Sequence, residues 1–111
     1  MMKVAGRDAL RKLLAANKGV VLQFSASWCG PCKLFHPHVE SAARNYPEIK
    51  FLAADVDEEE GLAGEYAVST VPTTFFFLNG ERHEKLVGSD AARLNAILRE
   101  MRQKTTPTTA H

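Results

Sequence analysis

Two cysteines three positions apart are the residues of this chain best suited to chemistry. Cys29 and Cys32 are its only cysteines, and they stand in the run WCGPCK at residues 28–33. Residues i and i+3 of a helix are neighbours, with Cβ atoms about 5–6 Å apart. Such a pair can form and break a disulfide with ordinary geometry. The spacing therefore indicates a reversible two-electron switch.

The segments on either side place this pair where a strand gives way to a helix. The apolar residues 20–25 predict a strand in the centre of a sheet, and residues 33–46 predict a helix. A helix N-terminus stabilises a thiolate through the dipole and its free N–H groups, and Lys33 adds a positive charge nearby. We therefore expect Cys29 to be an accessible nucleophile and Cys32 to be the resolving thiol.

The two residues between the cysteines, Gly30 and Pro31, suit this position. Proline is tolerated in a first helical turn, where its missing N–H would have no partner, and its stiffness limits how far the sulfurs separate. Glycine lets another chain approach closely. In the expected mechanism, Cys29 attacks a substrate disulfide, and Cys32 then attacks the mixed disulfide and releases the reduced substrate.

A CxxC pair can also be half of a zinc site or a structural disulfide. Zinc usually takes four ligands, but the chain has no second cysteine pair, and His36, His38 and His83 lack the required spacing. We therefore expect no metal. The N-terminus lacks the apolar stretch of a secretory signal, which argues against a structural disulfide because those form in oxidising compartments.

Length and composition indicate one globular domain of 111 residues with a net charge of +1. This charge gives no broad basic field for nucleic acid, and no apolar run is long enough for a membrane span. We expect a cytoplasmic protein. The basic residues near the N-terminus could also belong to a mitochondrial presequence, but Asp8 and the direct continuation into the fold favour an ordinary first helix.

Hydrophobic periodicity and turn signals predict the remaining elements. The first half of the chain is expected to form a helix at 7–17, a strand at 20–25, a helix at 33–46 that Pro37 kinks, and a strand at 49–56. A short helix at 58–66 and a hairpin of strands 73–78 and 81–87 follow, with the turn of the hairpin at Asn79-Gly80. Ser89-Asp90 would cap a last helix, whose buried stripe would consist of Leu94, Ile97, Leu98 and Met101. A βαβ unit followed by a ββα unit makes an α/β fold, with helices on both faces of a mixed sheet. We expect one domain over residues 1–104 and a disordered polar tail over 105–111.

The chain resembles the thioredoxin family over nearly its whole length apart from the tail. The redox motif at residues 28–33 carries the match, which is extended by Phe24-Ser25-Ala26, Pro37, Asp55-Val56-Asp57, Val71-Pro72-Thr73, Asn79-Gly80 and Gly88. The resemblance implies a thioredoxin fold and a monomeric enzyme that reduces disulfides in other proteins. It implies no bound cofactor, with electrons coming from NADPH through a thioredoxin reductase.

The resemblance also implies roles for residues outside the pair. Trp28 would belong to a flat apolar docking surface, although it could also be a half-buried packing residue. Val71-Pro72 would form a cis-proline loop beside Cys29, and the Val71 backbone would pair with an extended substrate strand. Gly88 would leave space for that strand, or would simply be a turn glycine before the last helix.

One position departs from the family pattern. Thioredoxins usually hold a buried Asp beneath the resolving cysteine, where this chain has Gln23, and Ala53 stands where that Asp usually has a charged partner. Glutamine cannot carry a proton at neutral pH, so we expect a slower resolving step. Losing a buried ionisable pair also removes a desolvation cost from the fold. The sequence thus predicts a competent but slower reductase.

Two rival functions stay open at this point. An oxidant or isomerase could share the fold, although Pro31 and the lack of a secretory signal argue against it. A docking subunit with incidental cysteines could use the surface around Trp28 and Val71-Pro72. Gln23 keeps the second alternative open, since a fold alone does not fix a function.

Overall fold

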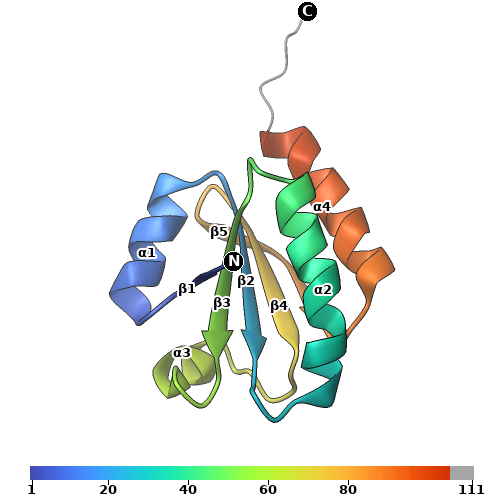
Figure 1. Ribbon diagram of the computed structural model, residues 1–111. Helices are drawn as coiled ribbons and strands as arrows, with labels where there is room; N and C mark the ends of the chain where they lie inside the picture. Colours follow the sequence, from blue (N-terminus) through green and yellow to red (C-terminus); the bar gives the residue numbers. More distant parts are fainter. Residues whose placement is uncertain (106–111) are drawn as a thin grey trace, which may run out of the picture.

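The computed structural model of the chain describes residues 1–105. Its elements are β1 (Met2–Lys3), α1 (Arg7–Ala16), β2 (Gly19–Ser25), α2 (Gly30–Asn45), β3 (Lys50–Asp55), α3 (Glu60–Glu65), β4 (Thr73–Leu78), β5 (Glu81–Val87) and α4 (Ala91–Thr105). Figure 1 shows their arrangement. Within this described part, no helix is both long and apolar enough to span a bilayer.

The five strands form one mixed sheet in the order β1-β3-β2-β4-β5 (Figure 1). The central strand, β2, pairs in parallel with β3 and antiparallel with β4. Residues 19–24 of β2 are all buried, as expected for a strand that is covered on both faces. The central position predicted for residues 20–25 is therefore confirmed.

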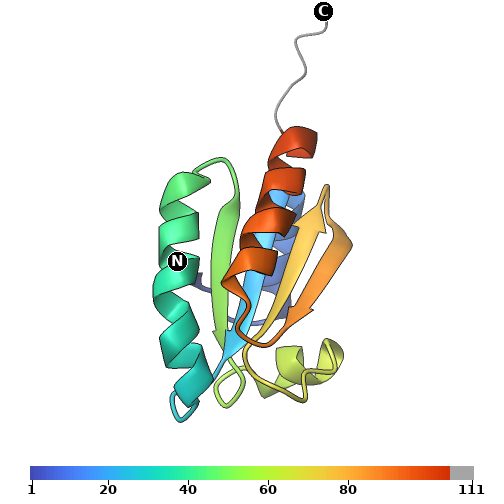
Figure 2. The ribbon, with the colours of Figure 1, turned by 90° about the vertical axis from the view of Figure 1, so that its right-hand side faces the viewer.

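Helices cover both faces of this sheet (Figure 2). On one face, α2 and α4 lie side by side over a cluster that includes Val21 and Phe76. On the other face, α1 and α3 cover a cluster that includes Leu22 and Phe75. Successive side chains of a strand point to opposite faces, so neighbouring residues supply both cores. The predicted mixed sheet between two helical layers is confirmed.

The second helix begins earlier than predicted. It starts at Gly30 rather than at Lys33, and Cys29 is its N-cap. Pro31 permits this start because the first turn of a helix needs no N–H from that residue. Pro37 lies inside the helix, which continues to Asn45.

Other boundaries also differ from the prediction. The third helix is shorter than residues 58–66, because the carboxylate of Asp55 accepts hydrogen bonds from two following N–H groups and turns the chain there first. The strand β1 was not predicted, since two residues carry no periodic signal. Thr105 closes α4 and does not begin a tail. The rest of the predicted tail, residues 106–111, lies outside the described residues.

The turns near the C-terminal hairpin agree with the prediction. Asn79 and Gly80 both have positive φ, at 53° and 82°, as a tight two-residue hairpin requires. Asp90 caps α4, because its Oδ1 accepts a hydrogen bond from the N–H of Arg93 at 2.9 Å. The stripe predicted for this helix is buried.

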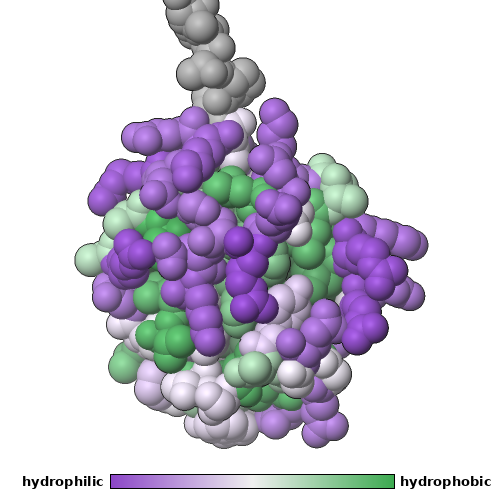
Figure 3. Space-filling model, turned by 180° about the vertical axis from the view of Figure 1, so that it is seen from behind, coloured by the Kyte–Doolittle hydropathy of each residue, from purple (hydrophilic) through white to green (hydrophobic). Residues whose placement is uncertain are grey.

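The surface around the edge strand β5 is largely hydrophilic (Figure 3). Glu81, Arg82 and Lys85 of this strand are exposed. Charged side chains on an edge strand hinder its pairing with another sheet. The edge of this sheet is therefore protected.

Two neighbouring threonines of β4 differ in their hydrogen bonds. Thr73 and Thr74 are both buried. The Thr73 hydroxyl donates to the carbonyl of Thr70, whereas Thr74 Oγ1 has no partner among the described residues. A buried hydroxyl without a partner costs free energy that an apolar group of similar shape avoids.

We expect the substitution Thr74→Val to raise the free energy of unfolding by about 1 kcal/mol, as measured by urea denaturation. Thr73→Val is the matched control: it leaves the Thr70 carbonyl without its donor and should lower the free energy of unfolding. Equal destabilisation by both substitutions would contradict this account.

Candidate active site

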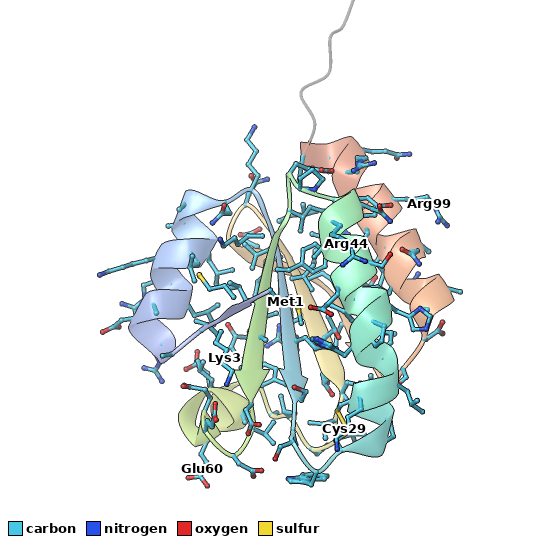
Figure 4. The ribbon with its side chains drawn as sticks, viewed as in Figure 1. Met1, Lys3, Cys29, Arg44, Glu60 and Arg99 are labelled. Atoms are coloured by element: carbon cyan, nitrogen blue, oxygen red, sulfur yellow. A yellow bond between two sulfur atoms is a disulfide. The ribbon has the colours of Figure 1, made fainter. Side chains whose placement is uncertain are left out.

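Cys29 and Cys32 are joined by a disulfide at the start of α2, with their Cα atoms 5.3 Å apart. Figure 4 shows Cys29 beside the first turn of this helix, at the end of the molecule where β2 also ends. The structure therefore represents the oxidised state of the pair. It places the two cysteines at the strand-to-helix junction predicted from the sequence.

The first turn of α2 directs a free N–H group at Cys29. The backbone N–H of Cys32 donates a hydrogen bond to Cys29 Sγ at 3.1 Å. When the disulfide opens, the same N–H group and the helix dipole would stabilise a thiolate on Cys29. Lys33 is exposed one residue further on and adds a positive charge to this end of the helix.

Both cysteines have a smaller solvent-exposed fraction than the sequence led us to expect. Cys29 is 4% exposed and Cys32 is 6% exposed. The cover comes from packing in a small cluster with Ala26, Val56 and Val71. The expectation that Cys29 lies open to solvent is wrong to this extent, because most of the residue is covered in the oxidised state.

The Val71-Pro72 loop lies against the disulfide. Its peptide bond is cis, as the resemblance implied, and the Val71 carbonyl oxygen lies 3.6 Å from Cys29 Sγ. The N–H of Gly88 donates to the Pro72 carbonyl at 2.8 Å. Gly88 has φ of 94°, and apart from its chain neighbours no atom of residues 1–105 lies within 4 Å of the place where a Cβ would stand. The residue is thus in the backbone region that favours glycine, with open space beside it.

A further hydrogen bond joins this region to the redox motif. Ser89 Oγ donates to the Pro31 carbonyl at 3.1 Å. The structure therefore brings three separate segments together, namely the redox motif, the cis-proline loop and the glycine after β5.

Trp28 stands on the surface beside this site. It is 67% exposed, and its Nε1 donates to Asp57 Oδ2 at 2.8 Å. The half-buried packing role considered for Trp28 is therefore wrong. Gly30 and Pro31 are also exposed.

Sequence reasoning missed Leu34, which is 77% exposed on the first turns of α2. The signal was present, because the buried stripe of this helix runs through Phe35 and Val39. Leu34 stands one residue before that stripe and therefore falls on another face. The missed partner Asp57 fixes the indole of Trp28 but had no local sequence signal.

Gln23 is almost fully buried, at 2% exposed, and its Nε2 has no partner among the described residues. It lies between Ala53 of β3 and Thr74 of β4 in the sheet register. It also lines an open cavity of about 290 Å³. The other lining residues are Ser25, Ala26, Cys32, Lys33 and His36.

Gln23 and Cys32 both line this cavity, so Gln23 lies close to the second cysteine, where the resemblance placed it. No carboxylate is among its lining residues in the described part of the chain. Sequence reasoning considered His36 only as a metal ligand, although a residue four positions after Cys32 lies on the same side of the helix. In residues 1–105, no three His, Cys, Asp or Glu side chains group as ligands for a metal ion.

The comparisons with known proteins agree on one family. The family model "Thioredoxin" matches residues 2–101. Thioredoxin-1 of Schizosaccharomyces pombe is 34% identical over 97 residues, which is 87% of this chain and 94% of that protein. The thioredoxin of Ovis aries is 37% identical over 99 residues, which is 89% of this chain and 92% of that protein.

Solved structures give the same result. Oxidised mitochondrial thioredoxin 3 from Saccharomyces cerevisiae has a TM-score of 0.87 and 31% identity, covering 90% of this chain and 94% of that one. Fasciola hepatica thioredoxin has a TM-score of 0.87 and 34% identity, and the match covers 91% of this chain and 99% of that one. Together with the Cys29–Cys32 disulfide, these relatives make the protein a thiol–disulfide oxidoreductase that reduces protein disulfides, with the cysteine pair rather than a bound cofactor as its redox group. The chain belongs to the thioredoxin family.

Proposed function

We propose that this reductase uses Cys29 as its nucleophile and Cys32 as its resolving thiol. The observation that carries this assignment is the hydrogen bond from the Cys32 N–H to Cys29 Sγ at the start of α2. Among the hydrogen bonds of residues 1–105, Cys29 Sγ accepts a free N–H of the helix and Cys32 Sγ does not, and such groups favour a thiolate. Trp28 and Gly30, the neighbours of Cys29, are exposed and would offer a surface to the substrate beside its sulfur.

The proposed cycle moves two electrons to the substrate. The Cys29 thiolate attacks one sulfur of a substrate disulfide, and the other substrate sulfur leaves with the electron pair and takes up a proton. Cys32 then loses its proton and attacks Cys29 Sγ. The Cys29–Cys32 bond forms, the bond from Cys29 to the substrate breaks, and the second substrate sulfur leaves as a thiolate.

The substrate would dock as an extended segment across the exposed residues Trp28 and Pro31. The Val71 backbone would pair with this segment, which gives affinity with little demand on sequence. The open space at Gly88 would admit the segment beside Pro72. The exposed side chain of Leu34 would extend the apolar docking surface along α2.

The remaining partners follow the family pattern in this proposal. A thioredoxin reductase would return electrons from NADPH to the Cys29–Cys32 disulfide, and the protein would act as a monomer in the cytoplasm. The N-terminal basic segment would be an ordinary part of the fold, which is supported by the packing of Leu10 in α1 against the sheet. A docking subunit with incidental cysteines is not favoured.

The substitution Cys32→Ser should trap substrates as mixed disulfides on Cys29, because the resolving attack is removed. Non-reducing gels and mass spectrometry of the trapped adducts would measure this. Cys29→Ser is the matched control and should trap few or none. Equal trapping by both variants would contradict the assignment of roles.

The substitution Gln23→Asp should speed the reduction of insulin disulfides severalfold, because a carboxylate beneath Cys32 can accept its proton. The turbidity of precipitating insulin chains measures the rate. Gln23→Asn keeps an amide that cannot ionise, and it should give no such gain. An unchanged or slower rate with Gln23→Asp would count against a slow resolving step.

A further inference from the structure

The resolving step needs a proton acceptor that Gln23 cannot provide. A free cysteine thiol ionises at about pH 8.5, and burial disfavours the charged thiolate. Cys32 is 6% exposed, so it requires help to lose its proton near neutral pH. A glutamine side chain has no proton to exchange in this range, so an acceptor inside the protein would have to be another residue.

The cavity beside Cys32 contains one side chain of the required kind. Of the residues that line it, His36 carries an imidazole, which can accept and return a proton near neutral pH. Lysine side chains such as that of Lys33 are ordinarily already protonated there. The hydroxyl of Ser25 is not a base at neutral pH.

His36 has a charged partner on its own helix. Its Nε2 lies 3.3 Å from Glu40 Oε1. When Nε2–H donates to this carboxylate, Nδ1 keeps the lone pair that can accept a proton.

None of the other groups described around the cavity is as well suited as His36 to accept the proton of Cys32. On the β2 side of the cavity, Gln23 and Ser25 carry no charge. Asp55 of β3 is paired with Ser25 in the sheet register, but its Oδ1 already accepts two backbone N–H groups. Lys33 is the one cation among the described residues that line the cavity, and it would favour the Cys32 thiolate.

We propose that His36 accepts the proton of Cys32 through a water in this cavity, with Gln23 orienting the water and Glu40 orienting the imidazole. The cavity of about 290 Å³ exceeds the roughly 30 Å³ that a water occupies in the liquid. The unpaired Nε2 of Gln23 supplies a buried donor for that water. This inference deepens the proposed role of Cys32 and rests on it.

The step balances in atoms and electrons. The water takes the proton of Cys32 Sγ as it gives one to the imidazole. The electron pair of the Cys32 thiolate forms the bond to Cys29 Sγ, and the bond from Cys29 to the substrate breaks. The substrate sulfur leaves with the electron pair of the broken bond and takes a proton from the imidazolium, which restores His36, or from solvent.

Stopped-flow mixing of the reduced protein with excess Ellman's reagent separates the two thiols. The first release of thionitrobenzoate reports attack by Cys29, and its rate scales with reagent concentration. The second release reports attack by Cys32 on the mixed disulfide, and its rate is independent of reagent. The test variant is His36→Gln, and the matched control is His38→Gln, which changes an exposed histidine of the same helix that does not line the cavity.

We expect His36→Gln to slow the second release about tenfold or more between about pH 6 and 8 and to leave the first unchanged. In the unsubstituted protein, a plot of the rate of the second release against pH should show a step in this range, and His36→Gln should remove that step. Adding Gln23→Asp to His36→Gln should restore the rate, since a carboxylate then serves as the acceptor. His38→Gln should change neither release.

An unchanged second release in His36→Gln would overturn the proton relay, and so would equal slowing by His38→Gln. Circular dichroism of both variants checks that α2 remains folded. If the unsubstituted protein showed no first release from Cys29, the proposed function itself would fail. The two failures are therefore distinguishable.

Discussion

The structure depends on the way α2 begins immediately behind the sulfur of Cys29. The Cys29 N–H donates to the Ala26 carbonyl at 3.2 Å, which closes the turn after β2. The chain then enters the helix at Gly30, so the Cys32 N–H faces Cys29 Sγ. A free N–H of a first helical turn needs a partner, and here that partner is Cys29 Sγ. The same geometry places the second sulfur within reach of the first.

The sheet register explains why three distant segments meet at this point. Phe24, near the end of β2, is paired with Thr73 at the start of β4. Thr73 is in turn paired with Val87 at the end of β5. The residues just beyond these positions are the redox motif, the cis-proline loop and Gly88. The antiparallel pairing of β2, β4 and β5 therefore assembles the site, and the two cores keep the pairing fixed.

The sequence predicted those features that a local pattern determines. The burial of β2, the stripe of α4 and the turn at Asn79-Gly80 follow from periodicity and backbone preference, and all three were confirmed. The cis bond before Pro72 came only from the family resemblance. The cover over Cys29 was not predictable, because it depends on Val56 and Val71, which are distant in the chain. The place of His36 on the same side of α2 as Cys32 follows from their spacing of four residues, but the cavity that they share with Gln23 depends on packing of α2 against the sheet.

The central claim is that the start of α2 holds Cys29 as a thiolate near neutral pH. The direct measurement is the rate of alkylation of Cys29 by iodoacetamide in the reduced protein as a function of pH. The account predicts that this rate reaches its plateau well below the ordinary thiol ionisation near about pH 8.5. A rate that rises through about pH 8.5, as for a free cysteine, would contradict it.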